Sequence, residues 1–357
     1  MTVDSRIILG DPIFQLNTVL WMLQPAPHDA PIRPVLRDAG YLLGALSRNL
    51  PPPFELRPGL VRLVGSDTPP APDVLAEPPA GSPWLVLECK GSSFGVDSST
   101  TRQALKLLAA SADLRSSLGL AADTPAPGLV AYVTRQEDRD RLAGTLRELR
   151  GRLGEAGLPS SGTGVLGLAR EVGGGLYAAL SPGDEWPEAV ASVFDPPALV
   201  AGLDEDVDPR PLYLVPWDPS VQQDPEMRAF CRAVLFARIT SEAIAVLGHE
   251  RVPQRIILKL ETLLSAATFG VSDRWRSRRD LNRTIRDCKR FLASALGPVR
   301  DRLALAQPSD PDRIELTVRS QAELDSAIEA LGRANPFGGP PPEPEDQLSV
   351  LDASEEQ

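Results

Sequence analysis

The spacing of apolar residues predicts a first part of the chain in which helices and strands alternate. Short apolar runs bounded by Gly or Pro are typical of buried strands, and apolar residues repeated every three or four positions are typical of amphipathic helices. The strands predicted in this way are 7–9, 54–64, 72–75, 84–90 and 128–134. The predicted helices are 12–23, 34–48 and 100–118, with N-caps at Asp11 and at Ser98 or Ser99. Between residues 34 and 135 the order helix, three strands, helix, strand indicates an α/β unit.

The later part of the chain changes from mixed structure to helices. After a helix at 136–155 we expect a hairpin of 165–169 and 176–180, followed by a strand at 212–215. The remaining predicted elements are helices at 226–247, 253–267 and 273–296, a strand at 313–318 and a helix at 321–331. The predicted domains are an N-terminal extension 1–33, an α/β domain 34–220, a mainly helical domain 221–333 and a tail 334–357. Residues 336–357 hold six acidic residues and no basic one, which predicts a disordered acidic tail.

Composition narrows the class of protein. With 42% hydrophobic and 24% charged residues, the chain resembles ordinary soluble globular proteins. No apolar run approaches the roughly 20 residues of a membrane span, and the N-terminus lacks the pattern of a secretory signal. Three isolated cysteines (Cys89, Cys231 and Cys288) predict a reducing cytoplasm and neither a disulfide framework nor a zinc site. The two histidines, His28 and His249, are far apart, which argues against His-based triads and His-rich metal sites.

The run GSPWLVLECKG carries the most unusual chemistry of the chain. Its apolar part predicts a buried strand, and Glu88 and Lys90, two residues apart at the end of that strand, point to the same side. Charges on a buried strand are costly unless they are paired or hold a metal. Lys90 is one of only four lysines in the chain, and the pair Pro72-Asp73 precedes it on the preceding predicted strand. We therefore expect a functional site here; the alternative is a surface salt bridge at the end of a strand.

The residues Pro72-Asp73 and Glu88-Cys89-Lys90 resemble the PD-(D/E)xK motif of the restriction-endonuclease-like nuclease superfamily. The resemblance covers about residues 34–135 and includes the order of predicted elements. It implies a restriction-endonuclease-like mixed-sheet core, α-β-β-β-α-β, joined here to a helical C-terminal domain. It also implies that Asp73, Glu88 and the backbone carbonyl of Cys89 hold Mg²⁺ or Mn²⁺. Lys90 would then orient and polarise the attacking water and offset the charge of the phosphate.

Other matches to parts of this motif differ in how well they fit. In exonuclease-like branches of the superfamily a glutamine on the next helix also lines the site, and Gln103 falls in that place. The aromatic residue expected four positions later is Leu107, so this match is partial. Asp287-Cys288-Lys289 also fits (D/E)-x-K, but it lies on a predicted helix with no acid-bearing strand before it. Independently of any resemblance, phosphodiester hydrolysis needs a hard cation on carboxylate oxygens and a nearby positive charge.

The helix predicted at 273–296 carries a stripe of arginines. The sequence repeats D-x-x-R-x-x-R with a period of seven, and its arginines fall on one side at helical spacing: Arg276, Arg279, Arg283, Arg286 and Arg290. Residues 251–300 hold 12 Lys and Arg against 4 Asp and Glu, in a chain whose net charge is −11. Such a stripe can follow a phosphate backbone. The alternative is a solvated helix stitched by Asp–Arg pairs three residues apart, with a separate apolar seam through Leu281, Ile285, Cys288 and Leu292.

The resemblance implies a Mg²⁺- or Mn²⁺-dependent deoxyribonuclease with a role in restriction, repair or antiviral (phage) defence, and the cysteine usage predicts that it is cytoplasmic. DNA is the expected partner, and no membrane is expected. The alternative is a non-catalytic interaction or scaffold subunit that uses a nuclease-like fold within a multiprotein complex. In that case a protein partner, or a second copy of the chain, would bind through the helical domain.

Overall fold

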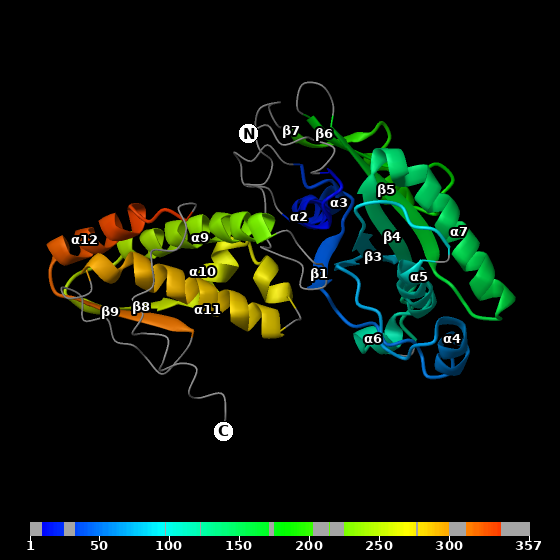
Figure 1. Cartoon of the computed structure of the whole chain (residues 1–357), viewed down its shortest axis with the longest axis horizontal. Helices are drawn as coiled ribbons and strands as arrows, with labels where there is room; N and C mark the ends of the chain where they lie inside the picture. The colour runs from blue at the N-terminus through cyan, green and yellow to red at the C-terminus, as the bar shows by residue number, and fades with distance from the viewer. Residues whose placement is uncertain are drawn as a thin grey trace. The chain divides into compact units, whose positions relative to one another are not determined.

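The computed structural model divides the chain into two compact units (Figure 1). The first unit is Met1–Asp218 together with Asp273–Arg278, and the second is Pro219–Ser272 together with Arg279–Gln357. The structure describes residues 9–24, 33–96, 98–121, 123–170, 175–202, 214, 225–275, 278–299 and 312–336. Within these residues, no helix has both the length and the apolar character that crossing a membrane requires.

A seven-stranded mixed sheet forms the centre of the first unit, and its strands follow one another in chain order. The strands are β1 Leu42–Leu46, β2 Val74–Glu77, β3 Trp84–Cys89, β4 Gly128–Arg135, β5 Gly162–Arg170, β6 Gly175–Leu180 and β7 Ala198–Gly202. The pairs β3–β4 and β4–β5 are parallel, and the four outer pairs are antiparallel. Parallel neighbours need a crossover between them. The α/β class is confirmed, with a sheet that combines both kinds of pairing.

Helices cover both faces of this sheet. The crossover helices α5 (Ser99–Ala110) and α7 (Arg139–Glu155) pack against each other and share one apolar core with Val86, Val130 and Val165 of the parallel strands. Helix α2 (Pro12–Leu23) packs on β1, β3 and β4 from the other side (Figure 1). It is buried on nearly all sides, and its polar side chains Gln15, Asn17 and Thr18 donate hydrogen bonds to backbone carbonyls. The segment 1–33, expected to be an extension, thus contains a helix that belongs to the sheet core.

The end of β3 lies very close to the start of α2. A Cβ atom at Gly91 would lie 2.3 Å from the carbonyl oxygen of Gly10, so no other residue fits there without displacing the backbone. The Asp11 side chain caps α2 by accepting a hydrogen bond from the Ile13 backbone N–H, and Pro12 occupies its first turn. The predicted N-cap of α2 is confirmed.

Two predictions upstream of β3 are wrong. The helix expected at 34–48 ends after one turn, α3 (Val35–Asp38), because Gly40 adopts a φ of +88°, and the chain then continues as β1. The strand expected at 54–64 is instead helix α4 (Arg57–Val64), with Pro58 in its first turn and Gly65 in the left-handed region at its end. In both segments the glycine and proline positions decide the structure, and the apolar pattern alone does not.

Most of the other predicted elements of the first unit are found. They include β3, β4, α7 and the antiparallel pair β5–β6; the helix expected at 100–118 is interrupted and resumes as α6 (Arg115–Leu118). Helix α8 (Glu188–Val193) and β7 were not predicted. Apart from Leu9, which is helical, and Leu214, the strands expected at 7–9 and 212–215 lie outside the described residues, as does the tail from residue 337.

The second unit combines four helices with a two-stranded sheet. Its elements are α9 Pro225–Gly248, β8 Gln254–Lys259, α10 Leu260–Ala267, α11 Arg278–Ala295, β9 Arg313–Val318 and α12 Gln321–Gly332. Strands β8 and β9 pair antiparallel, and all six elements contribute to one apolar core. The helix expected at 253–267 is therefore wrong in its first half. There Ile256 and Leu258 face the core while Ile257, between them, is 41% exposed, which is the alternation of a strand.

The edge strand β1 of the first unit has one further neighbour. Leu46 forms a parallel bridge with Trp275, a buried residue of the short segment Asp273–Arg278 that belongs to the same unit. Edge strands expose unpaired backbone groups, and this bridge covers part of that edge.

Candidate active site

The pairing of β2 with β3 brings the two candidate carboxylates together. Val74 pairs with Leu87 in an antiparallel register, so Asp73 and Glu88 occupy the next opposed positions at the end of the two strands. The Asp73 Oδ2 atom accepts a hydrogen bond of 2.7 Å from the Cys89 backbone N–H, which fixes the carboxylate beside β3. Asp73 is two residues from Leu75 and Glu88 is two residues from Val86, and both apolar residues face the core. Since alternate residues of a strand point to the same side, the two carboxylates lie on the sheet face that α5 and α7 cover.

Glu88 is buried and is held by two donors. Only 2% of its surface is exposed, and its Oε1 atom accepts from Lys90 Nζ at 2.8 Å and from Gln103 Nε2 at 2.8 Å. Gln103 comes from α5, while Lys90 follows β3 directly. The structure thus brings together Asp73, Glu88, Lys90 and Gln103, the four residues that the sequence suggested. Leu107 packs in the apolar core and takes no part.

Lys90 is a fixed positive charge in this arrangement. Its partial burial lowers its pKa, but the charge and hydrogen bond of Glu88 and the charge of Asp73 together outweigh burial and raise the pKa above its ordinary value. Lys90 therefore carries its positive charge at neutral pH beside the two carboxylates. Its chemistry here is to neutralise negative charge, first that of the two carboxylates.

The donor set of this site suits a hard divalent cation. Asp73 and Glu88 supply carboxylate oxygens, and the Cys89 backbone carbonyl is the third atom that the motif suggests; the Cys89 thiol is buried on the opposite face. The described residues contain no group of three or more His, Cys, Asp or Glu side chains able to hold a metal. A cation here would thus keep several water or phosphate oxygens, as Mg²⁺ commonly does.

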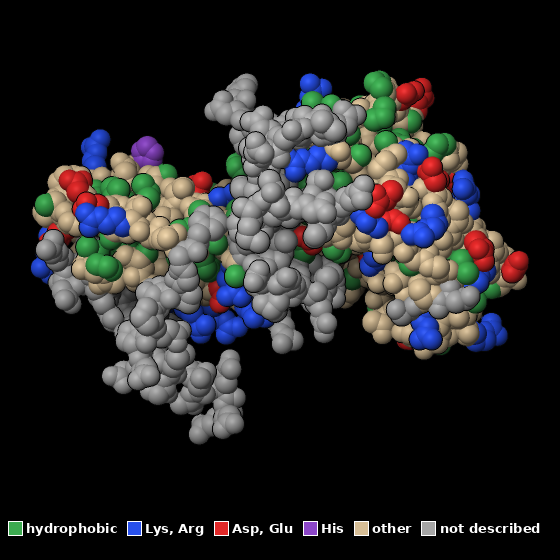
Figure 2. All heavy atoms as spheres, turned by 45° about the horizontal axis from the view of Figure 1, so that its top comes forward, with side chains coloured by type: hydrophobic (Ala, Val, Ile, Leu, Met, Phe, Trp, Pro, Cys, Tyr) green, Lys and Arg blue, Asp and Glu red, His purple; other side chains and the backbone are tan. Residues whose placement is uncertain are grey.

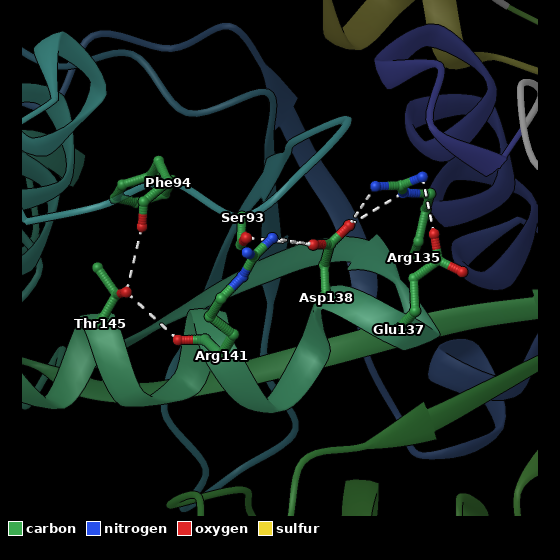
Figure 3. Close-up of polar contacts among 7 residues, drawn as sticks. All are labelled: Ser93, Phe94, Arg135, Glu137, Asp138, Arg141 and Thr145. Atoms are coloured by element: carbon green, nitrogen blue, oxygen red, sulfur yellow. Dashed lines mark hydrogen bonds and ion pairs between the residues drawn. The ribbon is translucent and has the colours of Figure 1, made fainter.

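A second polar cluster, which the sequence reasoning missed, joins the end of β4 to the loop after β3 (Figure 3). Asp138 is 3% exposed and accepts hydrogen bonds from Arg135, Arg141 and Ser93, while Arg135 also pairs with Glu137 at 2.8 Å. Burial raises the pKa of Asp138, but these donors lower it by more, so the carboxylate is ionised at neutral pH. The sequence signal for this cluster is the spacing of Arg135, at the end of a strand, and Asp138, three residues later at the start of a helix.

This cluster helps to hold the loop that runs from Lys90 to the start of α5. Besides the Ser93–Asp138 bond of 3.1 Å, Thr145 Oγ1 donates to the Phe94 carbonyl at 3.1 Å (Figure 3). Farther along α7, Arg152 donates to the Val96 carbonyl at 3.2 Å. One contact with Asp138, just before α7, and two contacts with α7 itself therefore hold the loop between β3 and α5.

Tyr132 is the second residue that the sequence reasoning missed. It pairs with Glu88 across the parallel β3–β4 ladder, so the two side chains lie side by side on the same face. The residue is fully buried, and the Phe94 ring packs against its ring with 5.6 Å between centroids. No sequence signal marks this tyrosine, because its neighbour Glu88 is defined only by the strand pairing.

The arginine stripe of the second unit lies largely on α11. Arg283, Arg286 and Arg290 are exposed, and Figure 2 shows Lys and Arg side chains grouped along the lower edge of this unit. Neither Arg286 nor Arg290 forms an ion pair among the side chains that the structure describes, so the Asp287–Arg290 pair of the alternative interpretation is not formed there. Arg276 and the side chain of Arg279 lie outside the described residues.

The apolar seam of α11 is internal. Its four residues are at most 6% exposed and belong to the core of the second unit: Leu281, Ile285, Cys288 and Leu292. The seam is therefore not available to a protein partner. The triplet Asp287-Cys288-Lys289 lies within this helix, away from any strand end.

Comparison with protein-family models, curated proteins and solved structures finds no match to this chain. The resemblance to the PD-(D/E)xK superfamily thus rests on the residues named above and on their arrangement.

Proposed function

We propose that the chain is a Mg²⁺- or Mn²⁺-dependent nuclease that hydrolyses phosphodiester bonds, with DNA as substrate, on a restriction-endonuclease-like core. The observation that carries this proposal is the convergence of Asp73, Glu88, Lys90 and Gln103 on one sheet face. They lie where β3 ends, and in open α/β sheets ligands bind outside the carboxyl ends of the strands. Restriction, repair and phage defence are the processes in which such an activity would serve.

Each residue has a distinct task in this proposal. Asp73 and Glu88 hold the cation, which when bound polarises phosphate oxygens and lowers the pKa of water. Gln103 keeps the Glu88 carboxylate in place through its hydrogen bond to Oε1. Lys90, protonated beside both carboxylates, offsets the negative charge that a phosphodiester brings and develops as it is cleaved.

Metal binding is the experiment that tests this proposal. The melting temperature of the full chain should rise by a few degrees in millimolar Mn²⁺ or Mg²⁺, since a ligand at 100 times its Kd stabilises the folded state by about 2.7 kcal/mol. Glu88→Gln should remove the shift, because the variant loses a carboxylate but keeps a similar shape. Glu185→Gln is the matched control, since Glu185 pairs with Arg150 on the same unit, near the start of β5. A wild-type protein whose melting is unchanged by either metal would rule out the nuclease.

We further propose that the exposed arginines of α11 bind the phosphate backbone of the nucleic acid. Replacing both Arg286 and Arg290 with Ala should weaken binding to duplex DNA of any sequence. It should also reduce the slope of log affinity against log salt by about 1.8, because each lost phosphate contact on duplex DNA changes the slope by about 0.9. Both arginines are exposed, so stability should hardly change.

Arg333→Ala is the matched control for this pair. Arg333 is an exposed arginine at the end of α12, in the same unit, and its guanidinium already pairs with Glu329. Its replacement should leave affinity and salt slope unchanged. Equal slopes for the wild type and the double variant would show that α11 does not contact phosphate.

A non-catalytic scaffold is the second candidate function, and one observation favours it. The charge of Glu88 is already compensated by Lys90, and Gln103 donates a hydrogen bond to the same oxygen, so the cluster can exist as a structural ion pair. The two candidates differ in the response to metal described above, since a scaffold needs no cation.

A further inference from the structure

The hydroxyl of Tyr132 is buried without a hydrogen bond. The residue is 0% exposed, and its hydroxyl oxygen has no hydrogen-bond partner in the part of the chain that the structure describes. Tyr41, equally buried on the same unit, has its hydroxyl satisfied by the Pro83 carbonyl at 3.0 Å. An unsatisfied buried hydroxyl destabilises a fold, so a buried phenol in this state requires an explanation.

The position of Tyr132 connects this hydroxyl to the candidate site. Tyr132 lies beside Glu88 in the β3–β4 ladder, and its ring is fixed on the other side by Phe94. A phenol ordinarily keeps its proton at neutral pH, so the Tyr132 hydroxyl can donate a hydrogen bond beside Glu88.

Two more buried polar atoms follow on the same side of the same segment. Thr134 Oγ1 is two residues further along β4, and Gln136 Oε1 lies over Gly167, the partner of Thr134 in the ladder. Neither atom has a hydrogen-bond partner among the described residues. Together with the Tyr132 hydroxyl they form a row of three buried polar atoms that runs along β4 to the residue after its end.

We propose that Tyr132 is a ligand-binding residue of the candidate site, whose hydroxyl donates a hydrogen bond to an oxygen brought in with the divalent cation. The oxygen belongs either to water on the cation or to the phosphate of the nucleic acid, which present the same acceptor. This inference rests on the proposed function and extends it with a residue outside the motif. It gives a hydrogen-bond acceptor to a hydroxyl that has none among the described residues of the protein.

Two tyrosine-to-phenylalanine variants of the full chain test this inference. Tyr132→Phe should leave the melting temperature of the metal-free protein unchanged or higher, because no hydrogen bond is lost. Tyr41→Phe should lower it by a few degrees, because the Pro83 carbonyl loses its donor. If the acceptor is water on the cation, Tyr132→Phe should need roughly tenfold more Mn²⁺ or Mg²⁺ for the same thermal shift, a change of about one hydrogen bond, while Tyr41→Phe responds as the wild type.

The outcomes distinguish the two oxygen sources, and they also distinguish failure of the Tyr132 inference from failure of the proposed nuclease function. Weaker metal binding without nucleic acid assigns the bond to water on the cation; unchanged metal binding with a roughly tenfold higher KM for DNA assigns it to phosphate. Tyr132→Phe with wild-type metal response and wild-type cleavage overturns the inference but leaves the nuclease intact. So does a melting temperature lowered as in Tyr41→Phe, since the hydroxyl would then have a structural role. A wild type without any metal response overturns both.

Discussion

Replacing Asp73 with Asn, or Lys90 with Ala, should reduce metal-dependent cleavage of DNA by about 10²–10³-fold, the loss typical of removing one preorganised electrostatic contact at a reacting oxygen. Asp73→Asn removes a carboxylate that would hold the cation, while an amide oxygen can still accept from the Cys89 N–H. Lys90→Ala removes the positive charge next to Glu88. Cleavage of plasmid and single-stranded DNA over a metal titration measures both effects.

The two variants should differ in stability. Asp73→Asn should change the free energy of unfolding by no more than about 1–2 kcal/mol. Lys90→Ala leaves the Glu88 carboxylate, which is 2% exposed, without its ion-pair partner and should cost about 3–5 kcal/mol. Lys90→Gln, which keeps a donor for Glu88, should therefore be measured beside it. Lys106→Ala is the control, since this lysine of α5 donates to the Thr68 carbonyl. Full activity in both Asp73→Asn and Lys90→Gln would eliminate the site.

Ile285→Asp should unfold the second unit. The side chain is 1% exposed in the core that α11 shares with α9 and β9, and an unpaired buried carboxylate there should cost at least about 4 kcal/mol. Loss of helical circular dichroism at a lower temperature or denaturant concentration measures this. Arg286→Ala, one residue along the same helix but exposed, should melt as the wild type.

The same variant separates two views of the helix. If the seam of α11 served a partner protein, Ile285→Asp would fold normally and lose only assembly. Normal melting of Ile285→Asp would therefore contradict the internal position of the seam.

The sequence was sufficient for the strands that carry the motif and for the helices that begin at clear caps. Trp84–Cys89 and Gly128–Arg135 are continuous apolar runs with Pro or Gly at their starts, a pattern that few alternatives satisfy. The Ser98 side chain caps α5 as predicted by accepting from the Thr101 N–H. Because α5 starts there, Gln103 lies one turn into the helix and reaches Glu88.

Elements whose structure depends on a partner far away in the chain could not be predicted from the sequence. Leu42–Leu46 and Gln254–Lys259 contain enough Leu and Ile to read as helix, and each becomes a strand because another strand, β2 or β9, pairs with it. Tyr132 and Asp138 were missed for a related reason. Their importance comes from contacts with the β3 strand and the loop after it, and no local spacing encodes those contacts.

The bridge between Leu46 and Trp275 has a consequence for dissecting the chain. The first unit takes its last piece from residues 273–278, so the chain leaves it, builds α9, β8 and α10 of the second unit, and then returns. A cut after Asp218 would yield every strand of the large sheet but strip one neighbour from its first edge. The bared backbone of β1 would be open to pairing with another chain, so such a fragment should tend to self-associate. Because each unit is built from two separate stretches of the chain, no single cleavage yields both units complete.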